Sequence, residues 1–592
     1  MAIAVETASQ ATQATPETRT RTITGGALAC EALLAAGVTT LFGYPGGAAL
    51  PFYRELMRYP RLHHVLVRHE QNAAHAADGY ARSTGRVGVC VATSGPGATN
   101  LLTGLATAFM DCVPVVALTG QVARAAIGTQ AFQEVDVVGM VGPITKGAFQ
   151  LRSAEEIPAV FAEAFRLAAE GRPGPVLIDF PKDVQLANVE VSSALPDLSP
   201  SPRESELSGA AQFALEQVVA LLQASERPVV IAGHGVAMAG ASDELREFAE
   251  ASGVPVGMTL LGLGAFPEHH PQGLGMVGMH GTVQANMAMH HADLVIGVGM
   301  RFDDRVVGRP KDFASGARIV HIDVDPRAFG RVVRADLPVL ADARAALRAL
   351  SDLVQHRERP EWWGRLRQWS SEHAECGLVE TESASADELP TTPEVVRALR
   401  RVMGGSAVVV SDIGQHQMFV ALHHGFDRPN QLLTSGGLGT MGYALPAALG
   451  VKAALPGRPV WAVVGDGGFQ MSAAELSTLV SSRLPVKVLI VNNQCLGMVR
   501  QWQELFYDNV YSHSLLPQPS FEALAKAHGC WATTVNRRDE LENALREAAL
   551  HPGPSVVDVR VPVEETVYPM VPAGSVPGEV RCVDDVDASL WA

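Results

Sequence analysis

The chain has 592 residues, of which 47% are hydrophobic and 18% are charged, a composition typical of folded globular proteins. One hydrophobic core does not extend over so long a chain, so about three or four domains are expected. The formal net charge of −16 argues against nucleic acid or an anionic membrane surface as a partner.

The N-terminal segment, residues 1–22, is rich in Ala, Thr and Gln and is predicted to be a disordered tail. It lacks the apolar core of a secretory signal. No uninterrupted apolar run is long enough to predict a membrane span, so no membrane partner is expected.

The seven cysteines are scattered and form no C-x-x-C pair. They favour a cytoplasmic location in a reducing compartment, and neither a disulfide framework nor a zinc site.

The first α/β run extends over residues 23–186, where apolar strand-like segments alternate with helical runs. This alternation predicts a mostly parallel sheet covered by helices. Glu70 stands at a predicted strand end, directly before the helix expected over residues 73–83. Taken alone, such a carboxylate more often interacts with the helix macrodipole than carries chemistry. The Pro- and Ser-rich residues 187–206 predict a linker.

A second α/β run covers residues 207–354, and the charged residues 355–390 predict another linker. The sequence around Gly233 does not match G-x-G-x-x-G, so the standard dinucleotide fingerprint is absent. A third α/β run occupies residues 391–561, followed by a tail over residues 562–592 without clear periodicity. The predicted fold class is therefore α/β, with three doubly wound parallel-sheet domains.

The most informative stretch lies in the third run and begins with Gly465-Asp466-Gly467-Gly468. An apolar strand over residues 459–464 precedes this glycine turn, and a helix and a second strand that leads to Asn493 follow it. Successive strands of such a unit lie parallel, so Asp466 and Asn493 are expected at the same edge of the sheet. Two oxygen ligands without a dedicated protein cage suit Mg²⁺ held jointly with a diphosphate. The alternative is an ordinary strand–helix–strand unit with a glycine turn.

This spaced pattern resembles the thiamine diphosphate motif, and residues 414–418 (GQHQM) and 435–442 (SGGLGTMG) extend the resemblance. The three α/β runs resemble the order of that superfamily, which is a pyrimidine-binding domain, a middle domain and a diphosphate-binding domain. Active sites of the superfamily form between the first domain of one subunit and the third domain of another. The resemblance therefore implies a homodimer or homotetramer.

The resemblance also implies roles for individual residues. Glu70 matches the catalytic glutamate that hydrogen-bonds the aminopyrimidine ring, and Met441 matches the apolar residue that holds the cofactor bent. Magnesium would be bound by Asp466, Asn493 and the backbone carbonyl of Cys495. The thiamine diphosphate site implied in this way comprises Gly46, Glu70, Gln415, His416, Gly439, Met441, Asp466, Gly467, Gly468, Asn493 and Met498.

Residues 496–507 (LGMVRQWQELFY) narrow the resemblance to the catalytic subunits of the acetolactate (acetohydroxyacid) synthase family. That family implies a substrate channel lined by Phe132, Gln133, Lys182 and Trp502. It also implies a structural FAD that takes no part in redox chemistry. The FAD-binding residues implied are Gly233, Thr259, Leu260, Gly278, Met279, His280, Arg301, Asp303, Arg305, Asp323 and Asp342.

The implied activity is that of a transferase in branched-chain amino acid biosynthesis, which supplies valine and isoleucine. Pyruvate is decarboxylated on thiamine diphosphate, and the hydroxyethyl unit is transferred to pyruvate or 2-ketobutyrate. A small regulatory subunit is a possible further partner. The alternatives are another thiamine diphosphate carboligase or decarboxylase, such as sulfoacetaldehyde acetyltransferase or a 2-ketoacid decarboxylase, a flavoenzyme similar to pyruvate oxidase, or a non-catalytic paralogue.

Overall fold

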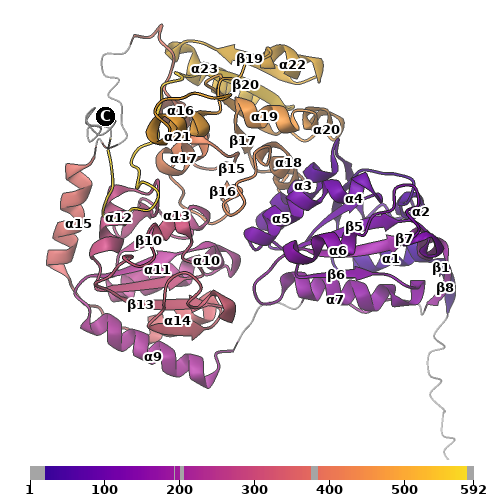
Figure 1. Cartoon of the computed structure of the whole chain (residues 1–592), viewed down its shortest axis with the longest axis horizontal. Coiled ribbons are helices and arrows are strands. Elements are labelled where there is room, and N and C mark those ends of the chain that lie inside the picture. Colours follow the sequence, from indigo (N-terminus) through magenta and orange to yellow (C-terminus); the bar gives the residue numbers. More distant parts are fainter. Residues whose placement is uncertain (1–19, 192–193, 201–205, 375, 377–384, 583–592) are drawn as a thin grey trace, which may run out of the picture.

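The computed structural model describes residues 20–191, 194–200, 206–374, 376 and 385–582. All but two of its strands form three six-stranded sheets, and every strand pair within these sheets is parallel. Helices flank each sheet, which confirms the predicted α/β class. Figure 1 shows the three sheets as three bodies, in indigo to purple, magenta to pink and orange to yellow along the chain.

The first sheet has the strand order β3-β2-β4-β5-β7-β6. Its central strands are almost continuous apolar runs because helices cover both faces of the sheet. The strands are β2 (Thr40–Gly43), β3 (His63–Leu66), β4 (Gly88–Ala92), β5 (Val115–Gln121), β6 (Gly147–Gln150) and β7 (Val176–Pro181). The helices are α1 (Gly25–Ala35), α2 (Leu50–Leu56), α3 (Glu70–Thr84), α4 (Pro96–Asn100), α5 (Leu102–Met110), α6 (Val137–Val141), α7 (Ile157–Ala169) and α8 (Lys182–Leu186).

The middle sheet has the order β11-β10-β9-β12-β13-β14. Its strands are β9 (Pro228–Ala232), β10 (Val256–Met258), β11 (Gly273–Met276), β12 (Leu294–Val298), β13 (Arg318–Asp323) and β14 (Leu337–Leu340). The helices around it are α9 (Gly209–Ala224), α10 (His234–Met238), α11 (Ser242–Ser252), α12 (Val283–His291), α13 (Asp304–Val307) and α14 (Ala343–Leu353).

The third sheet has the order β16-β15-β17-β18-β20-β19. Its strands are β15 (Val408–Ser411), β16 (Leu432–Leu433), β17 (Val460–Gly465), β18 (Lys487–Asn492), β19 (Trp531–Val535) and β20 (Ser555–Arg560). The helices are α16 (Thr392–Met403), α17 (Gln415–His423), α18 (Ala444–Ala454), α19 (Asp466–Ser472), α20 (Glu475–Ser481), α21 (Gly497–Phe506), α22 (Phe521–Ala527) and α23 (Leu541–Leu550).

The first and third domains share one hydrophobic core, centred on the contact between α3 and α18. Two glycines let the helix backbones approach closely. A Cβ atom at Gly79 would lie 2.2 Å from the carbonyl oxygen of Ala447, and one at Gly450 would lie 1.9 Å from that of Ala76. Another core cluster joins the middle and third domains. The interior is therefore continuous through the third domain.

The segments predicted as tails and linkers contain regular structure. Strand β1 (Arg21–Thr24) pairs with β8 (Asn188–Val191), so the predicted N-terminal tail and first linker meet as an antiparallel ribbon. The rest of that predicted tail, residues 1–19, lies outside the described residues. Helix α15 (Pro360–Glu372) lies within the second predicted linker and buries Trp362, Leu366 and Trp369.

Residues 562–582, which we call the C-terminal strap, extend from the third domain along the middle domain. The strap buries Val567, Met570 and Val571 although it forms no helix or strand. The backbone N–H of Val571 donates to the carbonyl of Met279, and that of Val567 to the side chain of Gln501. Tertiary contacts therefore order a segment whose sequence has no periodicity.

The strap ends in a disulfide bond between Cys376 and Cys582. The scattered cysteines predicted no disulfide framework, and this prediction is wrong for this pair. Two cysteines so far apart in sequence are brought together only by the fold. The other five cysteines are free. Among the described residues, no helix is both long and apolar enough to cross a membrane.

The disulfide is expected to stabilise the folded chain by roughly 2–4 kcal/mol relative to the reduced chain. The double variant Cys376→Ser/Cys582→Ser should therefore melt at a lower temperature than the oxidised wild type in a thermal scan without reductant. Cys376→Ser alone should have the same melting temperature as the double variant. A thiol reductant should lower the melting temperature of the wild type to this value and leave that of the variants unchanged. A reductant that left the wild type unchanged would contradict the bond.

Candidate functional site

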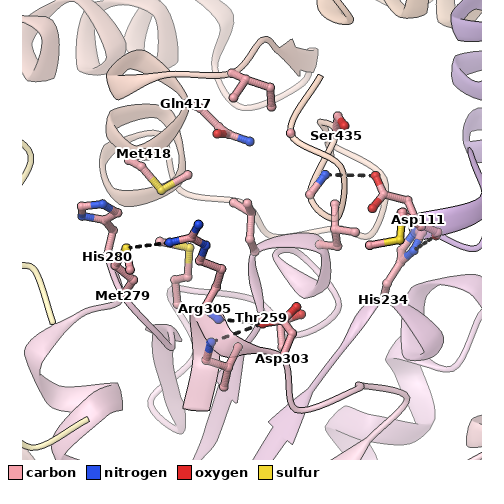
Figure 2. Close-up of a pocket in the computed structure, with 18 of the residues that line it drawn as sticks. Asp111, His234, Thr259, Met279, His280, Asp303, Arg305, Gln417, Met418 and Ser435 are labelled. Atoms are coloured by element: carbon pink, nitrogen blue, oxygen red, sulfur yellow. Dashed lines mark hydrogen bonds between the residues drawn. The ribbon is translucent and has the colours of Figure 1, made fainter. Parts of the chain in front are cut away.

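A cavity of about 540 Å³ lies where the three domains meet. The loops that line it follow the carboxyl ends of strands in the middle and third sheets, the usual position of ligand sites in doubly wound folds. Figure 2 shows Gln417 and Met418 of α17 on one side, with His280 and Arg305 of the middle domain opposite. The cavity is therefore bounded by structural units that are distant in sequence.

On the third-domain side, Asp466 and Asn493 follow β17 and β18 and both line the cavity, as the strand–helix–strand pattern predicts. One carboxylate oxygen of Asp466 accepts from the N–H of Gly467 at 3.0 Å, and the other accepts from Gln518 at 2.6 Å. Burial raises the pKa of Asp466 to about 6. A carboxylate and a carboxamide at one sheet edge are suitable ligands for a hard divalent cation.

Helix α17 begins at the cavity with Gln415 and His416. The Gln415 amide group donates to Gln501 at 2.9 Å and to the carbonyl of Glu565 at 2.7 Å. His416 is buried, and its Nε2 atom has no hydrogen-bond partner among the described residues. Burial lowers the pKa of His416 to about 4, so the ring is neutral near pH 7. A neutral imidazole with one open nitrogen suits a polar ligand in this cavity.

Glycines shape the same wall. A Cβ atom at Gly468 would lie 1.9 Å from Asp412, and one at Gly497 would lie 2.1 Å from Gln415. Gly439 adopts φ = +72° in the loop that carries Met441. Every residue predicted from the third domain lines the cavity: Gln415, His416, Gly439, Met441, Asp466, Gly467, Gly468, Asn493, Cys495, Met498 and Trp502.

On the middle-domain side, Arg305 contacts two other lining residues. Its guanidinium group lies over the Trp502 ring, 5.8 Å from the ring centroid. It also donates to the sulfur of Met279 at 3.5 Å, a contact that Figure 2 shows. The Nδ1 atom of His280 has no hydrogen-bond partner among the described residues, and burial lowers the pKa of this residue to about 4. The other predicted FAD residues that line the cavity are Thr259, Leu260, Arg301, Asp303, Asp323 and Asp342.

Two of the predicted FAD residues, Gly233 and Gly278, lie beside the cavity without lining it. A Cβ atom at Gly233 would lie 2.2 Å from the carbonyl oxygen of Gly299, so the two loops approach through their backbones. Gly278 has φ = +103°, a conformation that favours glycine. Both therefore shape the loops that present the lining residues.

The residues predicted from the first domain do not line this cavity. They follow the carboxyl ends of β2, β3, β5 and β7, and so belong to one edge of the first sheet. The Glu70 carboxylate accepts from Asn100 at 2.9 Å, and Gly97 adjoins it. Phe132 leaves 87% of its surface exposed. The set is Gly46, Glu70, Phe132, Gln133 and Lys182.

The sequence patterns missed six first-domain residues that do line the cavity: Met110, Asp111, Cys112, Gly171, Arg172 and Pro173. The guanidinium group of Arg172 donates to the sulfur of Cys112 at 2.9 Å. Cys112 has φ = +63°, which is uncommon for a residue with a side chain. No motif marks these positions. The only signal is a charged residue, Asp111, within an otherwise apolar stretch.

Three family models match the chain, one for each domain. They describe the N-terminal TPP binding domain of thiamine pyrophosphate enzymes over residues 23–140, the central domain over residues 215–350 and the C-terminal TPP binding domain over residues 412–559.

Curated relatives match over almost the whole chain. An acetolactate synthase of Mycobacterium bovis is 44% identical, covering 94% of this chain and 91% of the relative. The large subunit of acetolactate synthase isozyme 3 of Escherichia coli is 44% identical, covering 93% and 96% respectively. The large subunit of the acetolactate synthase of Lactococcus lactis is 43% identical, covering 93% and 94%.

Glu565 of the C-terminal strap anchors Thr392, which lines the cavity, and is expected to make stability depend on pH. Its carboxylate accepts from the N–H of Thr392 at 2.7 Å and also from the Thr392 hydroxyl. Burial raises the pKa of Glu565 from 4.5 to about 7. The folded state therefore holds the proton more tightly than the unfolded state, and this group lowers stability as pH rises from about 4.5 to about 7.

Glu565→Gln removes the titrating group but keeps an acceptor oxygen. The melting temperature of the wild type minus that of Glu565→Gln should fall as pH rises through this range and level off above about 7. Glu564→Gln, at the exposed neighbouring position, is the matched control for the removal of one carboxylate from this segment. A difference that stayed constant or rose for Glu565→Gln would contradict the assignment.

Proposed function

The chain belongs to the acetolactate synthases of the thiamine pyrophosphate enzyme family, and we propose that it joins the two-carbon unit left by decarboxylation of pyruvate to pyruvate or 2-ketobutyrate. The observation that carries this proposal is the convergence of Asp466, Asn493, His416 and Met441 on one cavity. Bound thiamine diphosphate supplies the electron sink for decarboxylation. The protein positions the reactants and excludes water.

Magnesium is proposed to bind the side chains of Asp466 and Asn493 and the backbone carbonyl of Cys495. The fit is supported by the near-complete burial of Asp466, which is 2% exposed, at a sheet edge beside Asn493. A cation would favour the ionised form of this carboxylate, whose pKa is raised by burial. His416, with its open nitrogen, is proposed to contact the diphosphate.

Structural FAD is proposed to bind the middle-domain side of the cavity. Asp323 and Asp342 stand at the carboxyl edge of the sheet, where carboxylates can accept from ribose hydroxyls. Arg301 and Arg305 provide positive charge for phosphates. Polar atoms with no hydrogen-bond partner in the described part of the chain, such as His280 Nδ1, are consistent with a polar ligand.

Glu70 is proposed to act on a cofactor held by a second copy of the chain, because it does not line the cavity of its own chain. Its carboxyl group would hold and release the proton at the aminopyrimidine ring. The edge of the first sheet that carries Glu70 exposes Leu50, Leu66 and Phe132. An apolar edge of this kind is suited to burial in a homodimer or homotetramer.

Lys182, Phe132 and Gln133 lie at that same edge and are proposed to line the 2-ketoacid channel together with Trp502 of the second copy. The positive charge of Lys182 would attract the substrate carboxylate. Two of the relatives are named as large subunits, which implies a smaller subunit in those proteins. We extend this to a small regulatory partner for the present chain.

The proposed reaction is tested by incubating the purified chain with pyruvate while thiamine diphosphate, Mg²⁺ or FAD is omitted in turn. We expect acetolactate, identified by mass spectrometry, only when all three are present. No oxygen uptake should accompany turnover, since the flavin is structural. Acetaldehyde as the main product, or stoichiometric oxygen consumption, would overturn the proposal in favour of a decarboxylase or an oxidase.

Sharing of the site between copies is tested by complementation. Glu70→Gln and Asp466→Asn should each lower kcat by about 10²–10⁴-fold as homo-oligomers. Co-assembly of the two variants leaves one of two sites intact in each mixed dimer, so random mixing should restore about a quarter of wild-type activity.

Co-assembly of Asp466→Asn with Asn493→Ala is the matched control. Both changes lie on the same side of the site, so no gain is expected. If the Glu70→Gln mixture also showed no gain, Glu70 and Asp466 would have to act within one chain.

A further inference from the structure

Residues 434–443 connect β16 to α18, and we call them the Met441 loop. Ser435, Gly436, Gly439 and Met441 of this loop line the cavity. The loop forms neither helix nor strand. Since no sheet or helix hydrogen bonds fix its backbone, its position depends on groups outside the loop.

The first half of the loop is held by Asp111, which follows α5 in the first domain. One carboxylate oxygen accepts from the N–H of Gly437 at 2.7 Å, and the other accepts from the N–H of Gly436 at 3.0 Å. The residue is only 1% exposed. Figure 2 shows Asp111 between Ser435 and His234, on the wall of the cavity. A single buried carboxylate thus binds two successive backbone donors of another domain.

Asp111 is itself held in place from two directions. Arg82 of α3 donates to its carboxylate at 2.8 Å and to the carbonyl of Thr434 at 3.1 Å. His234 of the middle domain makes a hydrogen bond of 2.9 Å with the Asp111 backbone carbonyl. The three domains therefore meet at this one residue.

The second half of the loop is held by Asp412, which follows β15. Its two carboxylate oxygens accept from the N–H groups of Gly442 and Tyr443, each at 3.0 Å. Between the two carboxylates, the Thr440 hydroxyl bonds to that of Thr107 at 2.7 Å. Met441 is consequently presented from a segment anchored on both sides.

We propose that Asp111 is a positioning residue for thiamine diphosphate, acting from the first domain by fixing the backbone of the Met441 loop. This inference rests on the proposed function of the cavity, and it adds a residue that no motif marks. Asp111 need not touch the cofactor. It holds Gly436 and Gly437 so that Met441 is in place before the cofactor arrives, which lowers the ordering cost of binding.

The test is Asp111→Asn, because a carboxamide has one acceptor oxygen and cannot accept from both glycine N–H groups in the same way. Arg82 keeps Asp78 as its ion-pair partner at 2.8 Å, so no isolated buried charge remains. We expect the thiamine diphosphate concentration for half-maximal activation to rise about 10- to 100-fold. Equilibrium binding, followed by quenching of tryptophan fluorescence, should weaken by the same factor.

Asp179→Asn is the matched control. Asp179 is 0% exposed in the first domain and accepts from Thr119, Gln121 and Gln150, none of which belongs to the Met441 loop. It should lower the melting temperature without changing cofactor affinity. Equal weakening in both variants, or unchanged affinity in Asp111→Asn, would overturn the proposal.

Gly437→Ala approaches the same contact from the loop, since its Cβ atom would lie 2.8 Å from the Asp111 carboxylate. Gly437→Ala should therefore also weaken the binding of thiamine diphosphate. It tests the proposal by itself if Asp111→Asn does not fold. The binding measurement separates this proposal from the proposed reaction. A wild type that binds thiamine diphosphate but forms no acetolactate would refute the reaction, whereas the comparison of variants would still test the positioning role.

Discussion

The buried ion cluster of Arg82 with Asp78 and Asp111 is the interaction on which the arrangement of the domains depends. Arg82 is 3% exposed and both carboxylates are almost fully buried. Burial disfavours the charged guanidinium, but the adjacent carboxylates outweigh this and keep its pKa well above the ordinary value. Charges in such surroundings are stable only if every one is paired. The pairing is complete only when α3, the end of α5 and the third domain are all in place, so the cluster selects one arrangement among many.

This arrangement separates two sets of predicted site residues within one chain. The close approach of α3 and α18 fixes the first domain against the third, and the cavity forms on the side that faces the middle domain. Glu70 and the predicted channel residues of the first domain (Phe132, Gln133 and Lys182) follow other strand ends and do not line that cavity. This separation within one chain is the basis of the proposal that a second copy completes the site.

Sequence reasoning was reliable where local pattern and sheet geometry act together. The positions of Asp466 and Asn493 follow from parallel strands that end at the same edge, and the structure places both at the cavity. Helix α15 could also have been predicted, because Trp362, Leu366 and Trp369 have helical spacing after Pro360. The position of Asp111 at the cavity could not have been predicted, because one aspartate in an apolar stretch carries no periodic signal. The course of the C-terminal strap depends on tertiary contacts alone, as does the pairing of Cys376 with Cys582.

The bond between Cys376 and Cys582 has a topological consequence. These two residues flank the whole third domain, so the sulfur bridge closes that part of the chain into a covalent ring. A peptide bond cut anywhere inside the ring leaves a single molecule, because the two pieces remain joined through sulfur. Only reduction of the bridge would let a nicked third domain separate from the middle domain. The oxidation state of two cysteines thus determines whether a backbone cut between them divides the polypeptide.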